Sequence, residues 1–317
     1  MIEIRIMKKL ILLLALALSA VSALAQTPAR TFEFAQRDTC TLYLDVHQPS
    51  PGAELCFEGQ PKPTILFVFG GGFIMGRRDD PFHDNWFKIL NDNGYRVVSV
   101  DYRLGLKGQK MAFDLFHLFD SAKKTKHAVD VGVEDVFSAI SYLGEHASEL
   151  GIDMDRIVLA GSSAGAMISL SAAWEISKGN GPEGFRPAGV MSFAGAIVSD
   201  SGKPEYPVEP CPHLLIHGTD DAAVAYEKQS FGKWGVWGSS ALAKTFEKNV
   251  YPCCIYRYKG YSHAMAANYV QTWPLQKRFL EENVIKGVRR SVDAMVDDPT
   301  MPKWFSVSLD DIYKKNK

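Results

Sequence analysis

Short apolar runs alternate with helical stretches along most of the chain. Residues 64–69 (TILFVF) form a continuous apolar run, as expected for a strand buried on both faces. Residues 133–147 instead carry apolar side chains at helical spacing. Further predicted strands lie at 41–46, 96–100, 157–160, 188–193, 213–216 and 254–258, and further helices at 164–176 and within 227–251 and 263–288. This alternation predicts an α/β fold with a doubly wound, mostly parallel sheet flanked by helices.

Two segments fit this alternation poorly. Residues 105–130 are long and mixed in character, and residues 229–240 (QSFGKWGVWGSS) form a loop rich in Gly and Trp. Both follow predicted strands, at the sheet edge where substrate sites of α/β proteins gather, so each is a candidate lid or substrate wall. The spacing of the apolar side chains in the first segment equally suits a helix packed on the core. Those side chains are Phe113, Leu115, Phe116 and Phe119.

The N-terminus has the pattern of a secretory signal peptide. Lys8 and Lys9 precede an apolar run at 10–18, and Ala23 and Ala25 suit a cleavage site that ends residues 1–25. The alternative is an uncleaved anchor, but the run is short against the roughly 20 residues that span a bilayer. We therefore expect a secreted or periplasmic protein in which residues 26–317 form a single domain.

Charge and cysteine content narrow the function classes. The formal net charge is −1, and the absence of a basic stripe argues against nucleic-acid binding. After residue 25 the sequence has no second long apolar run, so we expect no membrane span once the signal peptide is cleaved. The cysteines lack zinc-site spacing, so we expect no metal and no cofactor, and nothing in the sequence indicates the oligomeric state. In an exported protein, Cys40 with Cys56 and Cys211 with Cys253 are candidate disulfides; buried thiols are the alternative for the second pair.

The stretch 158–170, VLAGSSAGAMISL, contains two adjacent candidate nucleophiles. A nucleophile on a sharp strand-to-helix turn needs small residues two positions before and after it. Gly161 and Gly165 meet this requirement around Ser163, whereas Ser162 has alanines at both positions. A helix-capping serine with packing glycines is the alternative. The strand and helix predicted on either side favour Ser163 as the nucleophile of a G-x-S-x-G elbow.

In α/β-hydrolases the other two members of the catalytic triad, an acid and then a histidine, follow the serine in the chain. We therefore consider residues after Ser163. His263 follows a predicted strand and precedes a helix, which suits a catalytic base; a surface-loop histidine is the alternative. The segment LLIHGTDDAAVAY offers Asp220 and Asp221 as the acid. It resembles the H-G-T-x-D-x-x-V pattern of serine esterases and related peptidases. On that pattern Asp221 is the acid, and Asp220 has the character of a turn residue.

A run of glycines follows the strand at 64–69. Glycines there let backbone N–H groups approach an oxyanion, so the N–H groups of Gly71 and Gly72 are candidate donors; a flexible turn is the alternative. The N–H of Ala164, directly after the candidate nucleophile, is the expected second donor. Phe73, which follows the glycines, is expected to line the substrate site.

Together these motifs, with DYRLG at 101–105 and DRIVLAGSSAG at 155–165, resemble the α/β-hydrolase superfamily over about residues 40–290. Within it they are most similar to esterases of the hormone-sensitive-lipase and feruloyl/acetyl carbohydrate-esterase type. Two features depart from that pattern. Phe69 stands where the family usually has a histidine that braces the glycine loop, and two aspartates compete for the acid position.

The resemblance implies a serine carboxylic ester hydrolase that uses Ser163, His263 and Asp221, and the N-terminal pattern adds the expectation that it is secreted. Small acyl or hydroxycinnamoyl esters, including those of carbohydrates, are the expected substrates. Trp234 and Trp237 are candidates for stacking on a sugar or phenolic ring, with simple packing as the alternative. Two other hypotheses remain. One is a peptidase of the prolyl-oligopeptidase type, which usually carries a large extra domain, and the other is a non-catalytic binding protein with a hydrolase fold.

Overall fold

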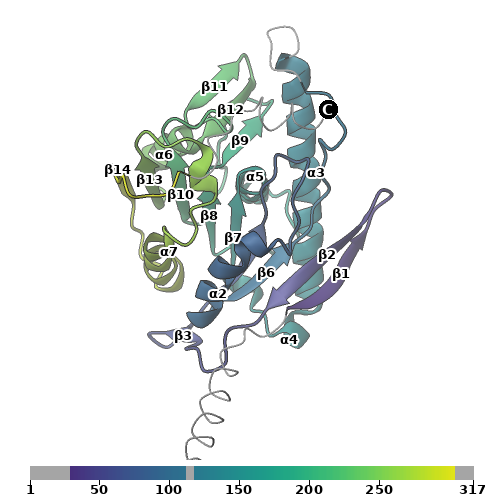
Figure 1. The fold of residues 1–317 in the computed structure, drawn as a ribbon, viewed down its shortest axis with the longest axis vertical. Coiled ribbons are helices and arrows are strands. Elements are labelled where there is room, and N and C mark those ends of the chain that lie inside the picture. The colour runs from purple at the N-terminus through teal and green to yellow at the C-terminus, as the bar shows by residue number, and fades with distance from the viewer. Residues whose placement is uncertain (1–28, 112–117, 304–317) are drawn as a thin grey trace, which may run out of the picture.

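The computed structural model describes residues 29–111 and 118–303, and within them a nine-stranded sheet dominates the fold (Figure 1). The strands run in the spatial order β1-β2-β6-β5-β7-β8-β10-β13-β14. Their bounds are Arg30–Gln36 (β1), Thr41–His47 (β2), Thr64–Val68 (β5), Arg96–Val100 (β6), Ile157–Ser162 (β7), Gly189–Phe193 (β8), His213–Gly218 (β10), Cys253–Tyr258 (β13) and Val292–Val296 (β14). From β6 to β14 all neighbours are parallel, whereas β1 pairs with β2, and β2 with β6, in the antiparallel sense. The predicted doubly wound, mostly parallel sheet is confirmed.

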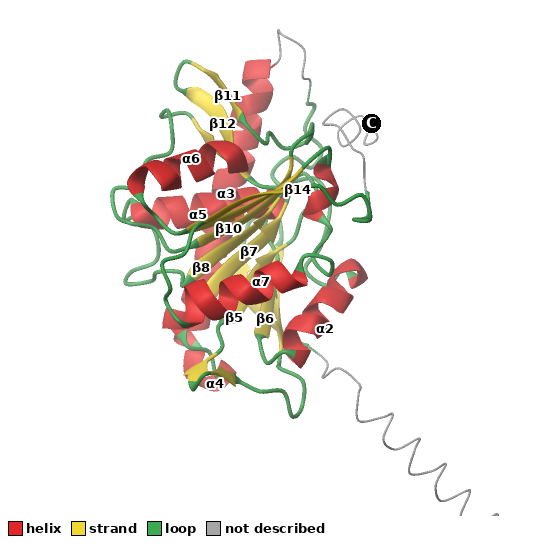
Figure 2. Cartoon of the chain, turned by 90° about the vertical axis from the view of Figure 1, so that its left-hand side faces the viewer, coloured by secondary structure: helices red, strands yellow, loops and turns green. Residues whose placement is uncertain are grey.

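Helices cover both faces of this sheet. Figure 2 shows α2 and α7 on one face and α3, α5 and α6 on the other. The helices are α2 (Asp84–Asp92), α3 (Leu118–Glu145), α4 (Ala147–Leu150), α5 (Ala164–Ser177), α6 (Ser239–Asn249) and α7 (Trp273–Phe279), which continues as a π-helix over Leu280–Ile285. Because both faces are covered, every residue of β5, β7, β8 and β10 is buried. This explains their near-continuous apolar sequences.

The Gly- and Trp-rich segment is a hairpin rather than a loop. β11 (Lys228–Phe231) and β12 (Trp234–Gly238) pair with each other, and β12 pairs with β9 (Ala196–Ser199) to form a second, three-stranded sheet. The hairpin contacts the start of α3, where the rings of Phe119 and Trp234 lie 5.2 Å apart. The expected loop at 229–240 was therefore wrong, because β9 supplies backbone partners that local sequence does not reveal.

Helix α3 begins at Leu118, well before the predicted start at residue 133. Its first turns contain most of the later half of segment 105–130, so the helical alternative holds from Leu118 onward. Phe113, Leu115 and Phe116 lie outside the described residues, as does the predicted signal peptide at 1–25. Among the residues that the structure describes, no helix is both long enough and apolar enough to cross a membrane.

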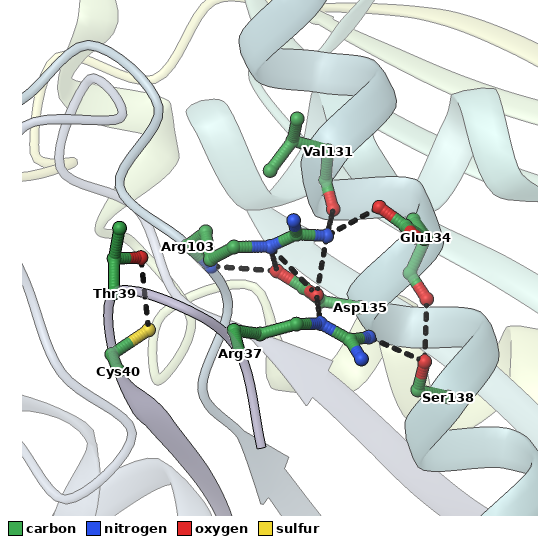
Figure 3. A network of polar contacts seen from close by, with 8 residues as sticks. All are labelled: Arg37, Thr39, Cys40, Arg103, Val131, Glu134, Asp135 and Ser138. Atoms are coloured by element: carbon green, nitrogen blue, oxygen red, sulfur yellow. Dashed lines mark hydrogen bonds and ion pairs between the residues drawn. The ribbon is translucent and has the colours of Figure 1, made fainter. Parts of the chain in front are cut away.

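A buried ionic network joins α3 to the first strands (Figure 3). Asp135 on α3 has no exposed side-chain surface and accepts hydrogen bonds from Arg37, at the end of β1, and from Arg103, just after β6. The backbone N–H of Arg103 also donates to Asp135, over 2.8 Å. A fully buried carboxylate requires such partners, because burying it unpaired would cost several kcal/mol. The network fixes the loop that follows β6, which packs beneath the glycine loop.

The five cysteines are all free thiols. Neither of the two candidate disulfides is formed in the structure. Burial raises the pKa of the Cys211 thiol to about 12, and burial likewise raises the pKa of Cys253 above its usual range. Both thiols are therefore protonated at neutral pH and behave as small apolar groups.

Candidate active site

Ser163 occupies a strained turn between β7 and α5. Its backbone angles are φ 52° and ψ −117°, a conformation that L-residues rarely adopt, and it separates the last strand residue from Ala164, the first residue of the helix. A methyl group at Gly161 would lie 2.2 Å from the carbonyl oxygen of Gly165, and one at Gly165 would lie 2.0 Å from that of Val68. The glycines of the G-x-S-x-G motif are therefore required by close backbone approach.

The structure brings Ser163, His263 and Asp221 into one hydrogen-bonded line. The His263 Nε2 atom lies 2.8 Å from the Ser163 Oγ atom, and His263 Nδ1 lies 2.8 Å from Asp221 Oδ2. Because a carboxylate only accepts hydrogen bonds, Nδ1–H donates to Asp221 and leaves Nε2 to accept from the serine hydroxyl. Ser163 and His263 are 9% and 6% exposed, and the Asp221 side chain is fully buried.

Of the two candidate acids, Asp221 and not Asp220 contacts His263. The Asp221 Oδ1 atom accepts from the backbone N–H groups of Ala223 and Val224, both over 2.9 Å. Its burial opposes ionisation, but hydrogen bonds from His217 and His263 outweigh this and hold the pKa of Asp221 well below its usual value. The Asp220 carboxylate is exposed and accepts from Thr219 Oγ1 instead.

Gly218 lets the loop that carries His263 approach the loop that carries Asp221. A methyl group at Gly218 would lie 2.2 Å from the carbonyl oxygen of Tyr261 and 2.4 Å from that of Ser262. Strands β10 and β13 are parallel neighbours that end at Gly218 and Tyr258 in register. The two loops therefore leave the same sheet edge side by side, which places the acid beside the histidine.

The glycine loop lies against Ser163. The Cβ position of Gly70 is 3.3 Å from the Cβ atom of Ser163, and Gly71 and Gly72 both have positive φ angles. Ala164 is the first residue of α5, so its N–H group has no acceptor four residues earlier within the helix. The backbone groups expected to form an oxyanion hole thus come from the two segments that border the serine.

Aromatic packing replaces the histidine brace expected beside the glycine loop. Phe69 stacks on Tyr102 at 4.5 Å between ring centroids, and the N–H of Leu106 donates to the Phe73 carbonyl over 3.0 Å. Both Tyr102 and Leu106 belong to the loop that Arg103 fixes to α3. The DYRLG motif therefore supports the glycine loop from below.

Ser162 does more than fill the elbow as a small neighbour. Its hydroxyl donates to the carbonyl of Ala266 over 2.7 Å and is hydrogen-bonded to Tyr269. Ala266 ends the 3-10 helix His263–Ala266, so Ser162 ties the nucleophile turn to the segment carrying the histidine. No local sequence pattern predicts this contact, because it joins residues more than 100 positions apart.

The three predicted substrate-wall residues differ in their exposure. Trp237 is 3% exposed and lies within the second sheet, so for this residue the packing alternative holds. Phe73 is 2% exposed and its ring packs near Tyr102. Trp234 remains half-buried against Phe119 and is the one of the three with an accessible ring.

Part of the chain is similar in sequence to known bacterial esterases. Esterase LipI of Mycobacterium tuberculosis is 30% identical over 129 residues, which cover 40% of this chain and 33% of that protein. An acetyl esterase of Salmonella paratyphi B is 29% identical over 118 residues, covering 36% of this chain and 30% of that protein. The chain thus spans about a third of the length of these curated relatives.

Solved structures match over a larger share of the chain. The esterase Est2 of Thermogutta terrifontis superposes with a TM-score of 0.57 at 19% identity, over 80% of this chain and 91% of that one. Its propionate-bound structure matches over 80% of this chain and 93% of that one, with a TM-score of 0.57 and 19% identity. Its structure phosphonylated by sarin matches over 81% of this chain and 95% of that one, with a TM-score of 0.56 and 17% identity. These likenesses support an α/β-hydrolase fold. A family model described as "Carboxylesterase family" matches residues 19–193, more than half of the sequence, and the chain therefore belongs to the carboxylesterase family.

Proposed function

We propose that this protein is a serine carboxylic ester hydrolase. The observation that carries the proposal is the line of 2.8 Å contacts from Ser163 through His263 to Asp221. In this line the histidine presents an unprotonated Nε2 atom to the serine hydroxyl, as a general base must. Membership of the carboxylesterase family supports the same chemistry.

The proposed reaction transfers an acyl group to water in two steps. Ser163 attacks the ester carbonyl while His263 removes the serine proton, and the N–H groups of Gly71, Gly72 and Ala164 stabilise the oxyanion. His263 then protonates the departing alcohol, which leaves an acyl group on Ser163. Water, activated by the same imidazole, attacks this acyl-enzyme and releases the carboxylic acid. Asp221 orients His263 and stabilises its protonated form.

The proposed substrates are small acyl and hydroxycinnamoyl esters, including those attached to carbohydrates. The acetyl esterase among the relatives and the propionate-bound neighbour support short acyl groups. Trp234 is the residue proposed to contact a sugar or phenolic ring, because its ring is only half-buried. We also propose that residues 1–25 are removed as a signal peptide and that the mature protein acts in the periplasm or outside the cell.

A substrate panel tests this function. The panel contains p-nitrophenyl acetate, butyrate and longer esters, acetylated xylan, methyl ferulate and a prolyl amide. We expect hydrolysis of the acetyl and butyryl esters by the native protein and its loss in Ser163→Ala. Cleavage of the prolyl amide without cleavage of any ester would favour a peptidase instead. Failure of the native protein to cleave any panel member or to react with a fluorophosphonate would favour a non-catalytic protein.

A further inference from the structure

A second histidine contacts the carboxylate that orients His263. His217 lies on β10, four residues before Asp221, and has no exposed surface. Its Nε2 atom is 3.1 Å from Asp221 Oδ2 and 3.2 Å from the carbonyl oxygen of Val224, and its Nδ1 atom is 2.8 Å from Ser239 Oγ. One carboxylate oxygen is thereby shared between the two imidazoles of His217 and His263.

These contacts determine where the proton of His217 lies. Both groups near Nε2 only accept hydrogen bonds, so Nε2 carries a hydrogen and donates it. The Ser239 hydroxyl lies 2.8 Å from Nδ1 and 3.3 Å from the carbonyl oxygen of Gly195, so its single proton best serves Nδ1. His217 is then a neutral imidazole whose N–H group points at the triad carboxylate.

We propose that His217 is a positioning residue for the proposed ester hydrolysis, because its Nε2–H group holds the Asp221 oxygen that also receives His263. This inference rests on the proposed function. The Oδ1 atom of Asp221 is already fixed by two backbone N–H groups, those of Ala223 and Val224. His217 fixes the other oxygen, so the carboxylate has no freedom to rotate away from the histidine that activates Ser163.

The charged groups around His217 make its effect on His263 predictable. The ring of Tyr226 lies 5.6 Å from the ring of His217, and the Tyr226 hydroxyl accepts a hydrogen bond from Arg257. Arg257 lies opposite His217 on the neighbouring strand β13 and forms an ion pair with Asp293. Burial lowers the pKa of His213, further along β10, to about 4, so His213 is neutral in the range of esterase assays. The carboxylate that His217 contacts directly is that of Asp221, which in turn contacts His263.

Removing the His217 N–H group is expected to stabilise the protonated form of His263. Asp221 stays beside His263 because its other oxygen remains bound, but its negative charge is then shared with one donor fewer. The protonated form of His263 becomes more favourable, so we expect the acid limb of the kcat/KM profile to move to higher pH.

Two substitutions at His217 and the same two at His213 test the proposal, with p-nitrophenyl acetate as substrate. His213 is a matched control because it lies on the same strand, is equally buried and donates its Nδ1–H to the carbonyl oxygen of Cys211 instead of contacting Asp221. We expect His217→Leu to lower kcat by about 10- to 100-fold, with little change in KM, because Asp221, although still beside His263, holds it less firmly in line with Ser163. His217→Gln, which keeps an N–H donor near the Nε2 position, should recover most of the activity and restore the native acid limb.

The outcomes separate this inference from the proposed function. Loss of stability at His217 without an effect on catalysis would give kcat values and acid limbs equal to those of His213→Leu, and would overturn the positioning role alone. An equal fall in His217→Gln and His217→Leu would also overturn it, because the retained donor would then have no value. A native protein without esterase activity or fluorophosphonate labelling would overturn both proposals. Circular dichroism on each variant verifies that the fold is retained.

Discussion

The ring of Phe69 stacks on the ring of Tyr102, with 4.5 Å between centroids and 29° between the ring planes. Phe69 directly precedes the glycine loop, and Tyr102 belongs to the loop that Arg103 and Asp135 fix to α3. The stack therefore attaches the glycine loop, which is proposed to bind the oxyanion, to a loop that the buried ionic network holds in place. An apolar contact here serves in place of a polar brace.

Phe69→Leu is expected to lower kcat on p-nitrophenyl acetate by about tenfold, because the loop donors lose alignment. The lost stacking should also reduce the free energy of unfolding by about 1 kcal/mol. Phe87→Leu is the matched control, since Phe87 on α2 is equally buried but lies outside this loop. It should lose similar stability and keep its kcat. Equal kcat values in the two variants would show that the stack does not support catalysis.

Asp221→Asn is expected to reduce kcat by about 10⁴, because the amide favours the wrong tautomer of His263 and cannot stabilise its cation. The neighbouring Asp220→Asn makes the same chemical change on an exposed carboxylate that contacts Thr219. Steady-state kinetics on both variants measure the difference. The assignment of the acid would have to be reversed if Asp220→Asn were the more damaged enzyme.

Gly165→Ala is expected to destabilise the fold by at least about 4 kcal/mol, because its methyl group would lie 2.0 Å from the carbonyl oxygen of Val68. The same substitution at Gly144 in α3 should instead stabilise by about 0.5–1 kcal/mol, since there the methyl group meets only the Met154 methyl at 3.8 Å. Urea unfolding of both variants tests this contrast in sign. Similar free energies of unfolding for the two variants would contradict the claim that the turn at Ser163 leaves no room for a methyl group at position 165.

Acid should destabilise the protein through His213. This side chain is fully buried, its Nε2 atom has no hydrogen-bond partner among the described residues, and burial lowers its pKa from 6.5 to about 4. The unfolded chain thus binds more protons between these values, so stability is complete above pH 6.5 and falls as the pH drops to about 4. The loss is up to about 3 kcal/mol.

The variant His213→Leu should flatten the dependence of unfolding free energy on pH between about 6.5 and 4. His127→Leu, at an exposed position on α3, serves as the control and should keep the native slope. Denaturant unfolding at several pH values provides the comparison. An unchanged slope in His213→Leu would show that this imidazole is not held neutral by its burial.

Much of the parallel sheet was predictable from local sequence. The run at 64–69 and the pattern at 96–100 correspond closely to β5 and β6, because strands covered on both faces are almost continuously apolar. The edge strands β1 and β14 were missed. Both have partly exposed residues along most of their length, so no such run marks them. The hairpin of β11 and β12 depends on its pairing with β9, which local patterns do not encode.

The order of the motifs in the chain predicted the three side chains of the site, but it did not predict the contacts that hold them in place. The elbow glycines and the H-G-T-x-D pattern pointed to Ser163 and Asp221, and the structure brings both to His263. The contacts of Ser162 with Ala266 and of His217 with Ser239 join separate segments of the chain. Such contacts arise only when the strands are assembled, so they leave no spacing signal in the sequence.

Covalent labelling shows directly whether Ser163 is the nucleophile. Native protein, Ser163→Ala and Ser162→Ala are treated with a fluorophosphonate, and the modified residue is located by mass spectrometry while p-nitrophenyl acetate turnover is followed. We predict a single adduct on Ser163 in the native protein. In Ser163→Ala the adduct should be absent and kcat should fall by about 10⁴ or more, whereas Ser162→Ala should still be labelled, though more slowly. Labelling or turnover of Ser163→Ala at the native level would contradict this prediction.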